Sequence, residues 1–282
     1  MTDILPPEAV TSLDLTNPPD GFLDDPFPFY DALLAHAPVL PQPDGSILLS
    51  RHEDLDRIYR DTRLYSSDKK AAFGPKFGVG SPLFEHHTTS LVFSDPPLHT
   101  RVRKIMTSAL TPRAIAKMEP GLIDTVDHLL DALAAKAQVD LIEDFASTIP
   151  IQIIGNLLDV PMSERGPLRD WSLSILGALE PALTEAQLAE GHKAVAEFKT
   201  YLEDLVARRR AAPGDPETDV LTRLINGEGA DAQLSEIELL QNCIFILNAG
   251  DHPRLVVGHT GYLFQQIGQK ILCIWFSKII VG

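Results

Sequence analysis

Cysteine is scarce in this sequence: Cys243 and Cys273 are the only two in 282 residues. Two cysteines cannot build the disulfide framework of a small secreted domain, and their scarcity fits a reducing compartment. The first residues also lack the basic and apolar segments of a secretory signal. The apolar stretch 271–281 is short and contains Lys278, so it does not predict a membrane span. We therefore expect a cytoplasmic protein with no membrane partner.

Positive charge is also low, with 24 Lys and Arg against 39 Asp and Glu and a formal net charge of −15. This balance argues against a nucleic-acid partner, because such proteins present a basic surface. Residues 95–118 are a local exception with a single acid, Asp95. Their basic residues are Arg101, Arg103, Lys104, Arg113 and Lys117. The patch is interpreted either as a docking surface for an acidic partner or as an ordinary solvated face, and charge alone leaves both open.

The hydrophobic pattern predicts a mainly α fold with a small β corner. Apolar residues make up 44% of the chain, enough for a substantial core. Helical periodicity is found at 27–36, 51–60, 96–110, 120–136, 143–158, 164–180, 184–211 and 235–249. A turn and a strand are expected between residues 38 and 50, followed by the helix 51–60 with Leu55, Ile58 and Tyr59 facing inward. The stretch 71–93, with its glycines and prolines, predicts a mobile loop.

Residues 94–110 predict a helix that can hold an anion. Ser94 or Asp95 is expected to cap it, with Pro96 and Pro97 in the first turn, where a missing N–H is tolerated. His99 and Arg103 are four residues apart and so project from one face. A histidine and a guanidinium on one face favour binding of a carboxylate or a phosphate, although a solvated basic face remains the alternative.

The same segment resembles a specific family. Asp-Pro-Pro-Leu-His-Thr-Arg-Val-Arg-Lys at 95–104, followed by Leu-Thr-Pro-Arg at 110–113, is similar to the C-helix segment of bacterial cytochromes P-450, the heme-thiolate monooxygenases. Residues 139–163, Phe-Pro-Phe-Tyr-Asp-Ala-Leu at 27–33 and Cys-Ile-Phe-Ile-Leu-Asn-Ala-Gly at 243–250 extend the resemblance over about residues 15 to 250.

The resemblance implies a cofactor, a reaction and partners. The cofactor is heme, with His99 and Arg103 holding its propionates and with Ala249 and Gly250 lining the groove on the oxygen side. Segments 71–93 and 164–195 would shape the substrate pocket. The reaction is insertion of one oxygen atom of dioxygen into a small organic substrate. A small ferredoxin-type iron–sulfur protein would deliver electrons, and the basic patch is the docking surface expected for it.

The resemblance stops near residue 250, where we expect an amino-terminal P-450-like portion, 1–250, to give way to a non-homologous tail, 251–282. The family's acid and threonine positions hold His252 and Pro253, and no glutamate follows Glu238 to supply a Glu-x-x-Arg pair. Cys273 lies nine residues after Phe264 with the intervening glycine at plus four, which is not the spacing of the heme-ligand loop.

A change of reading frame or a truncation after about residue 250 is the simplest interpretation. Without the thiolate ligand we expect no monooxygenase turnover from this chain and no catalytic or metal-ligating residue in it. The alternatives are a non-catalytic binding fragment and an unstable product of a disrupted gene. His86 and His87 are expected to be loop or surface histidines rather than a metal site, because no carboxylate stands at ligand spacing.

Overall fold

The computed structural model describes residues 4–110, 112–116, 118–216, 219–227 and 233–250. The described chain is mostly helical, with one two-stranded antiparallel sheet, which confirms the predicted fold class. It divides into two compact units, Met1–Ser66 with Glu180–Thr184, and Ser67–Leu179 with Glu185–Gly282. No helix in the described ranges is both long and apolar enough to cross a bilayer.

The first unit is the predicted β corner. It contains α1 (Glu8–Thr11), α2 (Phe27–His36), β1 (Val39–Pro41), β2 (Ile47–Leu49) and α3 (His52–Arg60). The hairpin pairs Val39 with Leu49, and Gly45, at φ 86°, supplies the positive φ of its turn. A core of six buried apolar residues joins α1 and α2 to the hairpin. Beside it, apolar side chains of α2 and β2 line a cavity of about 470 Å³.

The prediction that α3 turns its apolar residues inward is wrong for Leu55 and Tyr59, whereas Ile58 is half-buried. Leu55 is 36% exposed and Tyr59 is 77% exposed, and no residue of the helix is buried. Local charge pairs satisfy the helix instead: Arg51 Nε lies 2.9 Å from Asp54 Oδ2, and Arg60 Nε lies 2.8 Å from Asp56 Oδ1. Such pairs at three- and four-residue spacing support a helix without burial.

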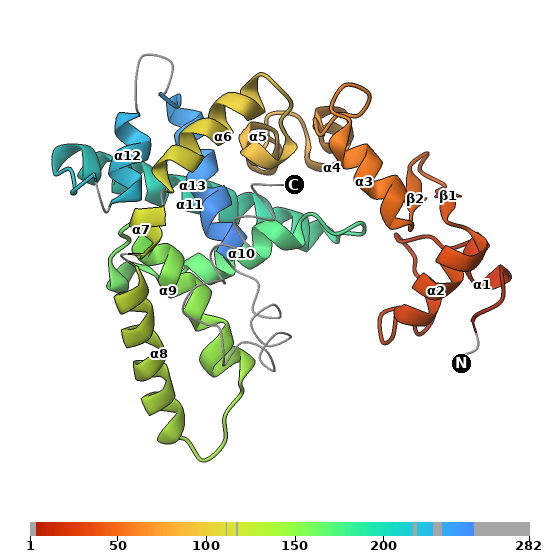
Figure 1. Cartoon of the computed structure of the whole chain (residues 1–282), viewed down its shortest axis with the longest axis horizontal. Coiled ribbons are helices and arrows are strands. Elements are labelled where there is room, and N and C mark those ends of the chain that lie inside the picture. The colour runs from red at the N-terminus through yellow and green to blue at the C-terminus, as the bar shows by residue number, and fades with distance from the viewer. Residues whose placement is uncertain (1–3, 111, 117, 217–218, 228–232, 251–282) are drawn as a thin grey trace. The chain divides into compact units, whose positions relative to one another are not determined.

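The second unit is an assembly of helices around α11 (Figure 1). Its elements are α4 (Lys70–Phe77), α5 (Pro82–Thr89), η1 (Leu91–Phe93), α6 (Leu98–Ala109), α7 (Pro112–Ala116), α8 (Glu119–Ala134), η2 (Ile142–Ala146), α9 (Thr148–Leu157), η3 (Met162–Glu164), α10 (Leu168–Gly177), α11 (Glu185–Ala211), α12 (Val220–Asn226) and α13 (Glu236–Gly250). The long helix α11 packs on α5, α10, α12 and α13. Its Phe198 and Leu202 are completely buried, as are Leu240 and Ile244 to within about 1% on α13.

The predicted mobile loop at 71–93 is wrong, because this stretch folds into α4, α5 and η1. Its glycines mark the break between two helices rather than a disordered run: Gly78 and Gly80 have φ of 84° and 80°. The next helix begins with a side-chain cap, since Ser81 Oγ accepts a hydrogen bond from the Phe84 N–H at 3.3 Å. Pro82 then occupies the first helical position, where proline is favoured.

Candidate cofactor-binding site

Helix α6 carries the two residues of the predicted anion grip, but it begins differently from the prediction. It starts at Leu98 with Pro97 at the N-cap position and with no side-chain cap. Ser94 Oγ donates instead to the Ser90 carbonyl at 3.0 Å, and Asp95 Oδ1 accepts from the Ser67 N–H at 2.8 Å. Both predicted capping side chains therefore stabilise the approach to the helix rather than its first turn.

A buried apolar stripe fixes one side of α6, as the periodicity predicts. Val102, Ile105, Met106 and Ala109 are each at most 5% exposed. At the carboxyl end of the helix, the Ser108 carbonyl accepts a hydrogen bond from Arg223 Nη2 of α12 at 2.7 Å. The helix is thus held by packing along its length and by a charge-assisted hydrogen bond at its end.

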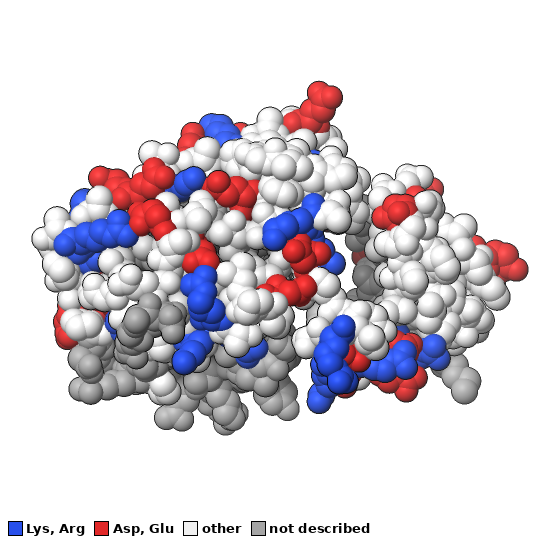
Figure 2. Space-filling model, turned by 90° about the horizontal axis from the view of Figure 1, so that it is seen from above, with Lys and Arg blue, Asp and Glu red and all other residues white. Residues whose placement is uncertain are grey.

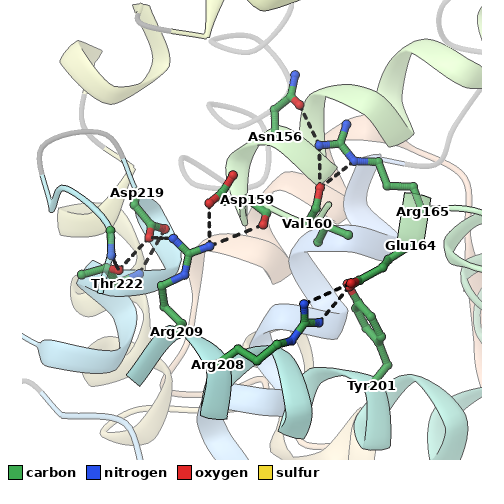
Figure 3. A network of polar contacts seen from close by, with 11 residues as sticks. Asn156, Asp159, Val160, Glu164, Arg165, Tyr201, Arg208, Arg209, Asp219 and Thr222 are labelled. Carbon is green, nitrogen blue, oxygen red and sulfur yellow. Dashed lines mark hydrogen bonds and ion pairs between the residues drawn. The ribbon is translucent and has the colours of Figure 1, made fainter. Parts of the chain in front are cut away.

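His99 and Arg103 lie one turn apart on α6, and both are half-buried. Burial and then the nearby Arg103 guanidinium lower the pKa of His99, while Asp95 opposes the change. In the described part of the chain Arg103 has no ion-pair or hydrogen-bond partner, although the arginines of the α9–α11–α12 region are all paired (Figure 3). A half-buried cation without an anion, beside a histidine, fits a bound carboxylate or phosphate.

The predicted basic patch is smaller than expected, because Arg101 is already used inside the fold. Its guanidinium forms an ion pair with the Glu238 carboxylate of α13 and donates to the Gln233 carbonyl at 3.2 Å. The Lys117 residue and the Arg113 side chain lie outside the described part. Lys104 is exposed. On the face seen in Figure 2, basic and acidic side chains are intermixed rather than separated, so a docking surface on α6 stays a prediction.

Helix α13 begins with a capping box. Glu238 Oε2 accepts from the Ser235 N–H at 2.8 Å, and Ser235 Oγ accepts from the Glu238 N–H at 3.4 Å. Burial alone would raise the pKa of Glu238, but these contacts and Arg101 outweigh it and hold the pKa below its ordinary value. Ala249 and Gly250 are the last residues of the helix. Their side-chain environment lies outside the description, so their role beside a heme stays a prediction.

The axial ligand is the part of a heme site that the described residues do not fit. Cys243 is fully buried in α13, and burial raises the pKa of its thiol to about 12, so it stays protonated. Cys273 lies outside the described residues. No group of three or more His, Cys, Asp and Glu within the described ranges is arranged to hold a metal ion. Among the described residues none is placed as a thiolate ligand, and the role of His99 and Arg103 at the heme propionates stays a prediction.

The placement of His86 and His87 on a surface loop is wrong: each is 3% exposed, on α5. His86 Nδ1 lies 2.8 Å from Gln241 Oε1 of α13, and Gln241 Nε2 donates to Glu85 Oε1 at 3.0 Å. Lys199 of α11 pairs with the same Glu85 oxygen at 3.0 Å. Burial lowers the pKa of His86 to about 4. No periodicity in the sequence predicts these polar contacts between α5, α11 and α13. Only Ser81, which caps α5, indicates in the sequence that the two histidines lie on a helix.

A second polar cluster ties α9, α11 and α12 together and is structural. Arg208 of α11 contacts Glu164, and Arg209 contacts Asp159 and Asp219 (Figure 3). Arg165 is 7% exposed and donates to uncharged oxygens, among them the Val160 carbonyl at 2.7 and 2.9 Å. Because every guanidinium in this cluster already has acceptors, it leaves no cation available for a ligand.

Comparison with known proteins identifies the family, although no family model matches the chain. The chain is 33% identical over 245 residues to "Vitamin D(3) 25-hydroxylase" of Pseudonocardia autotrophica, covering 86% of this chain and 58% of that protein. It is 28% identical over 278 residues to "Biotin biosynthesis cytochrome P450" of Bacillus subtilis (strain 168), covering 93% of this chain and 65% of that protein.

Solved structures agree with the sequence relatives. P450BioI in complex with hexadec-9Z-enoic acid ligated acyl carrier protein matches with a TM-score of 0.76 and 26% identity, over 88% of this chain and 64% of that one. Epothilone B-bound cytochrome P450epoK matches with a TM-score of 0.73 and 26% identity, over 90% and 64%. The chain thus spans 58% and 65% of the length of the two curated relatives described above. It belongs to the bacterial cytochrome P450 family.

Proposed function

We propose that this chain contributes the propionate-binding side of a heme site in a P450 monooxygenase. The reaction is insertion of one oxygen atom of dioxygen into a small organic substrate, with electrons from a ferredoxin-type protein in the cytoplasm. The observation that carries the proposal is the half-buried Arg103, which lies one turn from His99 and has no partner among the described residues. When bound, heme supplies the activation of oxygen, while His99 and Arg103 neutralise and orient its carboxylates. Ala249 and Gly250, at the end of α13, line the oxygen side.

The substrate pocket is proposed to be shaped by residues 70–93 and by α10 with the start of α11. Phe73, Phe77 and Phe93 gather here around His87, with ring centroids 5.0 to 5.8 Å apart in the contacting pairs. An apolar, aromatic lining suits an organic substrate better than a charged one. The related structures hold a fatty acid on acyl carrier protein in one case and epothilone B in the other, so the family relationship alone does not select a substrate.

We further propose that residues 1–282 by themselves do not catalyse the monooxygenase reaction. The sequence has no cysteine at the spacing of the heme-ligand loop, and the described Cys243 is held as a neutral thiol. A non-catalytic binding fragment or an unstable gene product is the second candidate. It is favoured by α8, an amphipathic helix with no buried residue and with Ile123 53% exposed.

Titration of the purified chain with hemin tests the propionate grip. Replacing Arg103 by Gln, or His99 by Gln, is expected to weaken hemin binding about tenfold or more, because each removes a charge-assisted hydrogen bond of roughly 1.5–3 kcal/mol. The matched control is Lys104→Gln, an exposed cation on the same helix. Equal affinity of the wild type and the Arg103 variant would contradict the proposed grip.

The same sample tests the predicted inactivity. The hemin complex is reduced under carbon monoxide, and the Soret band is recorded. A band typical of a histidine- or water-ligated heme is expected, whereas a thiolate-type band would overturn the prediction. Loss of hemin on gel filtration, together with aggregation, would favour the unstable gene product.

A further inference from the structure

We propose that Arg101 and Glu238 form a positioning pair that sets the rotation of α6 about its axis. Through that rotation the pair directs His99 and Arg103 toward the group they bind. The proposal deepens the proposed function and rests on it for the identity of the ligand. It concerns a contact between α6 and the first turn of α13, which are the two helices that carry the candidate cofactor-binding residues.

Arg101 projects from the side of α6 opposite to His99 and Arg103. It lies two residues from His99 and two from Arg103, so at 3.6 residues per turn it projects about 200° away from them. Its guanidinium is tied to Glu238 and to the Gln233 carbonyl, on the side of α6 facing the start of α13. A tether on one side of a helix fixes the direction in which the opposite side projects.

Glu238, which holds Arg101, is itself firmly held. The Glu238 side chain is 12% exposed. Its second carboxylate oxygen accepts from the Ser235 N–H at 2.8 Å, and its backbone carbonyl accepts from Asn242 Nδ2 at 2.8 Å. Because the carboxylate closes the capping box of α13, it cannot follow a movement of Arg101 without opening that cap.

The connection also closes a ring around the segment that leads into α6. The Asn242 side chain, which donates to Glu238, accepts a hydrogen bond from the Leu91 N–H at 3.0 Å. Leu91 lies in η1, a few residues before α6. One turn of α13 therefore holds both the entry to α6 and its Arg101, so the entry and the rotation of the helix are fixed together.

The remaining contacts of α6 do not do this alone. The buried stripe from Val102 to Ala109 is apolar and supplies no directional contact, and Arg223 holds only the Ser108 carbonyl at the far end. At the roughly 5–6 Å outer radius of a helix, a rotation of about 20° moves a side chain by about 2 Å. A displacement of that size breaks a hydrogen bond to a fixed carboxylate.

The test is a double-mutant cycle read by hemin titration. Arg101→Met removes the cation, and Glu238→Gln removes the charge while keeping a side chain that closes a capping box. Each single variant is expected to weaken hemin binding about five- to tenfold. The double variant should lose no more affinity than the more strongly affected single variant, because the pair acts as one unit. Arg101→Lys should restore most of the affinity, and Lys104→Met, an exposed neighbour, should change it less than twofold.

A second readout separates failure of this inference from failure of the proposed function. The pH titration of the His99 imidazole is followed by NMR without hemin, since Arg103 and burial both depress its pKa. In Arg101→Met the His99 pKa should move toward its ordinary value, while the far-UV circular dichroism matches that of Lys104→Met. An unchanged His99 titration in Arg101→Met overturns the positioning role whether or not the wild type binds hemin. A wild type that takes no hemin overturns the proposed function but leaves the titration as the test of positioning.

Discussion

At the scale of single residues, the buried pair His86 and His87 makes the stability of the fold depend on pH. Burial lowers the pKa of His86 to about 4. Burial, then the charges of His86 and Lys76, lower the pKa of His87 to about 2. Both values lie below the ordinary 6.5, so between these limits the unfolded chain binds protons that the folded chain does not. Stability is therefore full above about pH 6.5 and is lost as pH falls.

We expect the free energy of unfolding to decrease by on the order of 1.4 kcal/mol per pH unit for each histidine below pH 6.5. Urea unfolding at pH values between about 7.5 and 4.5 measures this slope. His87→Phe should make this slope shallower and leave the stability at neutral pH unchanged. The ring lies among Phe73, Phe77 and Phe93, and its Nε2 has no partner in the described part of the chain. The control is His52→Gln, at an exposed position. An unchanged slope in His87→Phe would show that this histidine does not titrate in the way its burial requires.

At the scale of elements, a close approach of one glycine to one arginine joins α9 to the segment before α10. A Cβ atom added to Gly155 would lie 2.6 Å from Arg165 Nε and 2.8 Å from Cδ. The arginine cannot move aside freely, because it donates to Asn156 Oδ1 at 2.8 Å (Figure 3). It also donates to Gln152 Oε1 at 2.6 Å.

Gly155→Ala is therefore expected to lower the free energy of unfolding by about 1–3 kcal/mol, the range for overpacking or for leaving a buried polar group unsatisfied. Gly166→Ala is the matched control, since a Cβ there meets nothing within 4 Å and the backbone φ is not positive. Both are measured by urea unfolding. If the two variants are equally stable, Arg165 is more mobile than its hydrogen bonds indicate.

The elements also show what the sequence can and cannot predict. Periodicity predicts α2 and α11 almost to the residue, because each is long enough for its apolar residues to repeat. The single helix predicted at 143–158 is observed as the π-helical turn η2 followed by α9, with Pro150 in the first turn of α9. Periodicity fails for 70–93, where Gly78 and Gly80 end one helix and precede the next, so that two short helices have the composition of a loop.

The candidate site follows the same division. The spacing of His99 and Arg103 is local, so the sequence predicts their shared face. The partner of Arg101 lies 137 residues away, and only the packing of α6 against α13 assigns it to Glu238. Charge counting placed Arg101 in a surface patch because it cannot distinguish a solvated cation from one paired across the fold.

At the scale of the whole molecule, α8 packs on α9 and η2 but keeps apolar side chains exposed in the described chain. This helix has the amphipathic pattern of a packed helix, and residues such as Leu122 and Val126 are half-buried. Yet no residue in it is buried, and Ile123 and Leu130 are 53% and 44% exposed. In the two curated relatives from Bacillus subtilis and Pseudonocardia autotrophica, 35% and 42% of the length lies outside the match with this chain, as follows from coverage of 65% and 58%.

Because exposed apolar helix faces favour association, the 282-residue chain is expected to self-associate through α8. The double variant Ile123→Gln, Leu130→Gln should raise the monomer fraction about threefold or more at micromolar concentration, as measured by sedimentation velocity. Ile47→Gln is the matched control, because Ile47 is 61% exposed but lies on β2 of the other unit. Equal effects of the two changes would mean that association is nonspecific. A wild type that stays monomeric at every concentration would remove the structural support for the unstable gene product and leave the binding fragment as the second candidate.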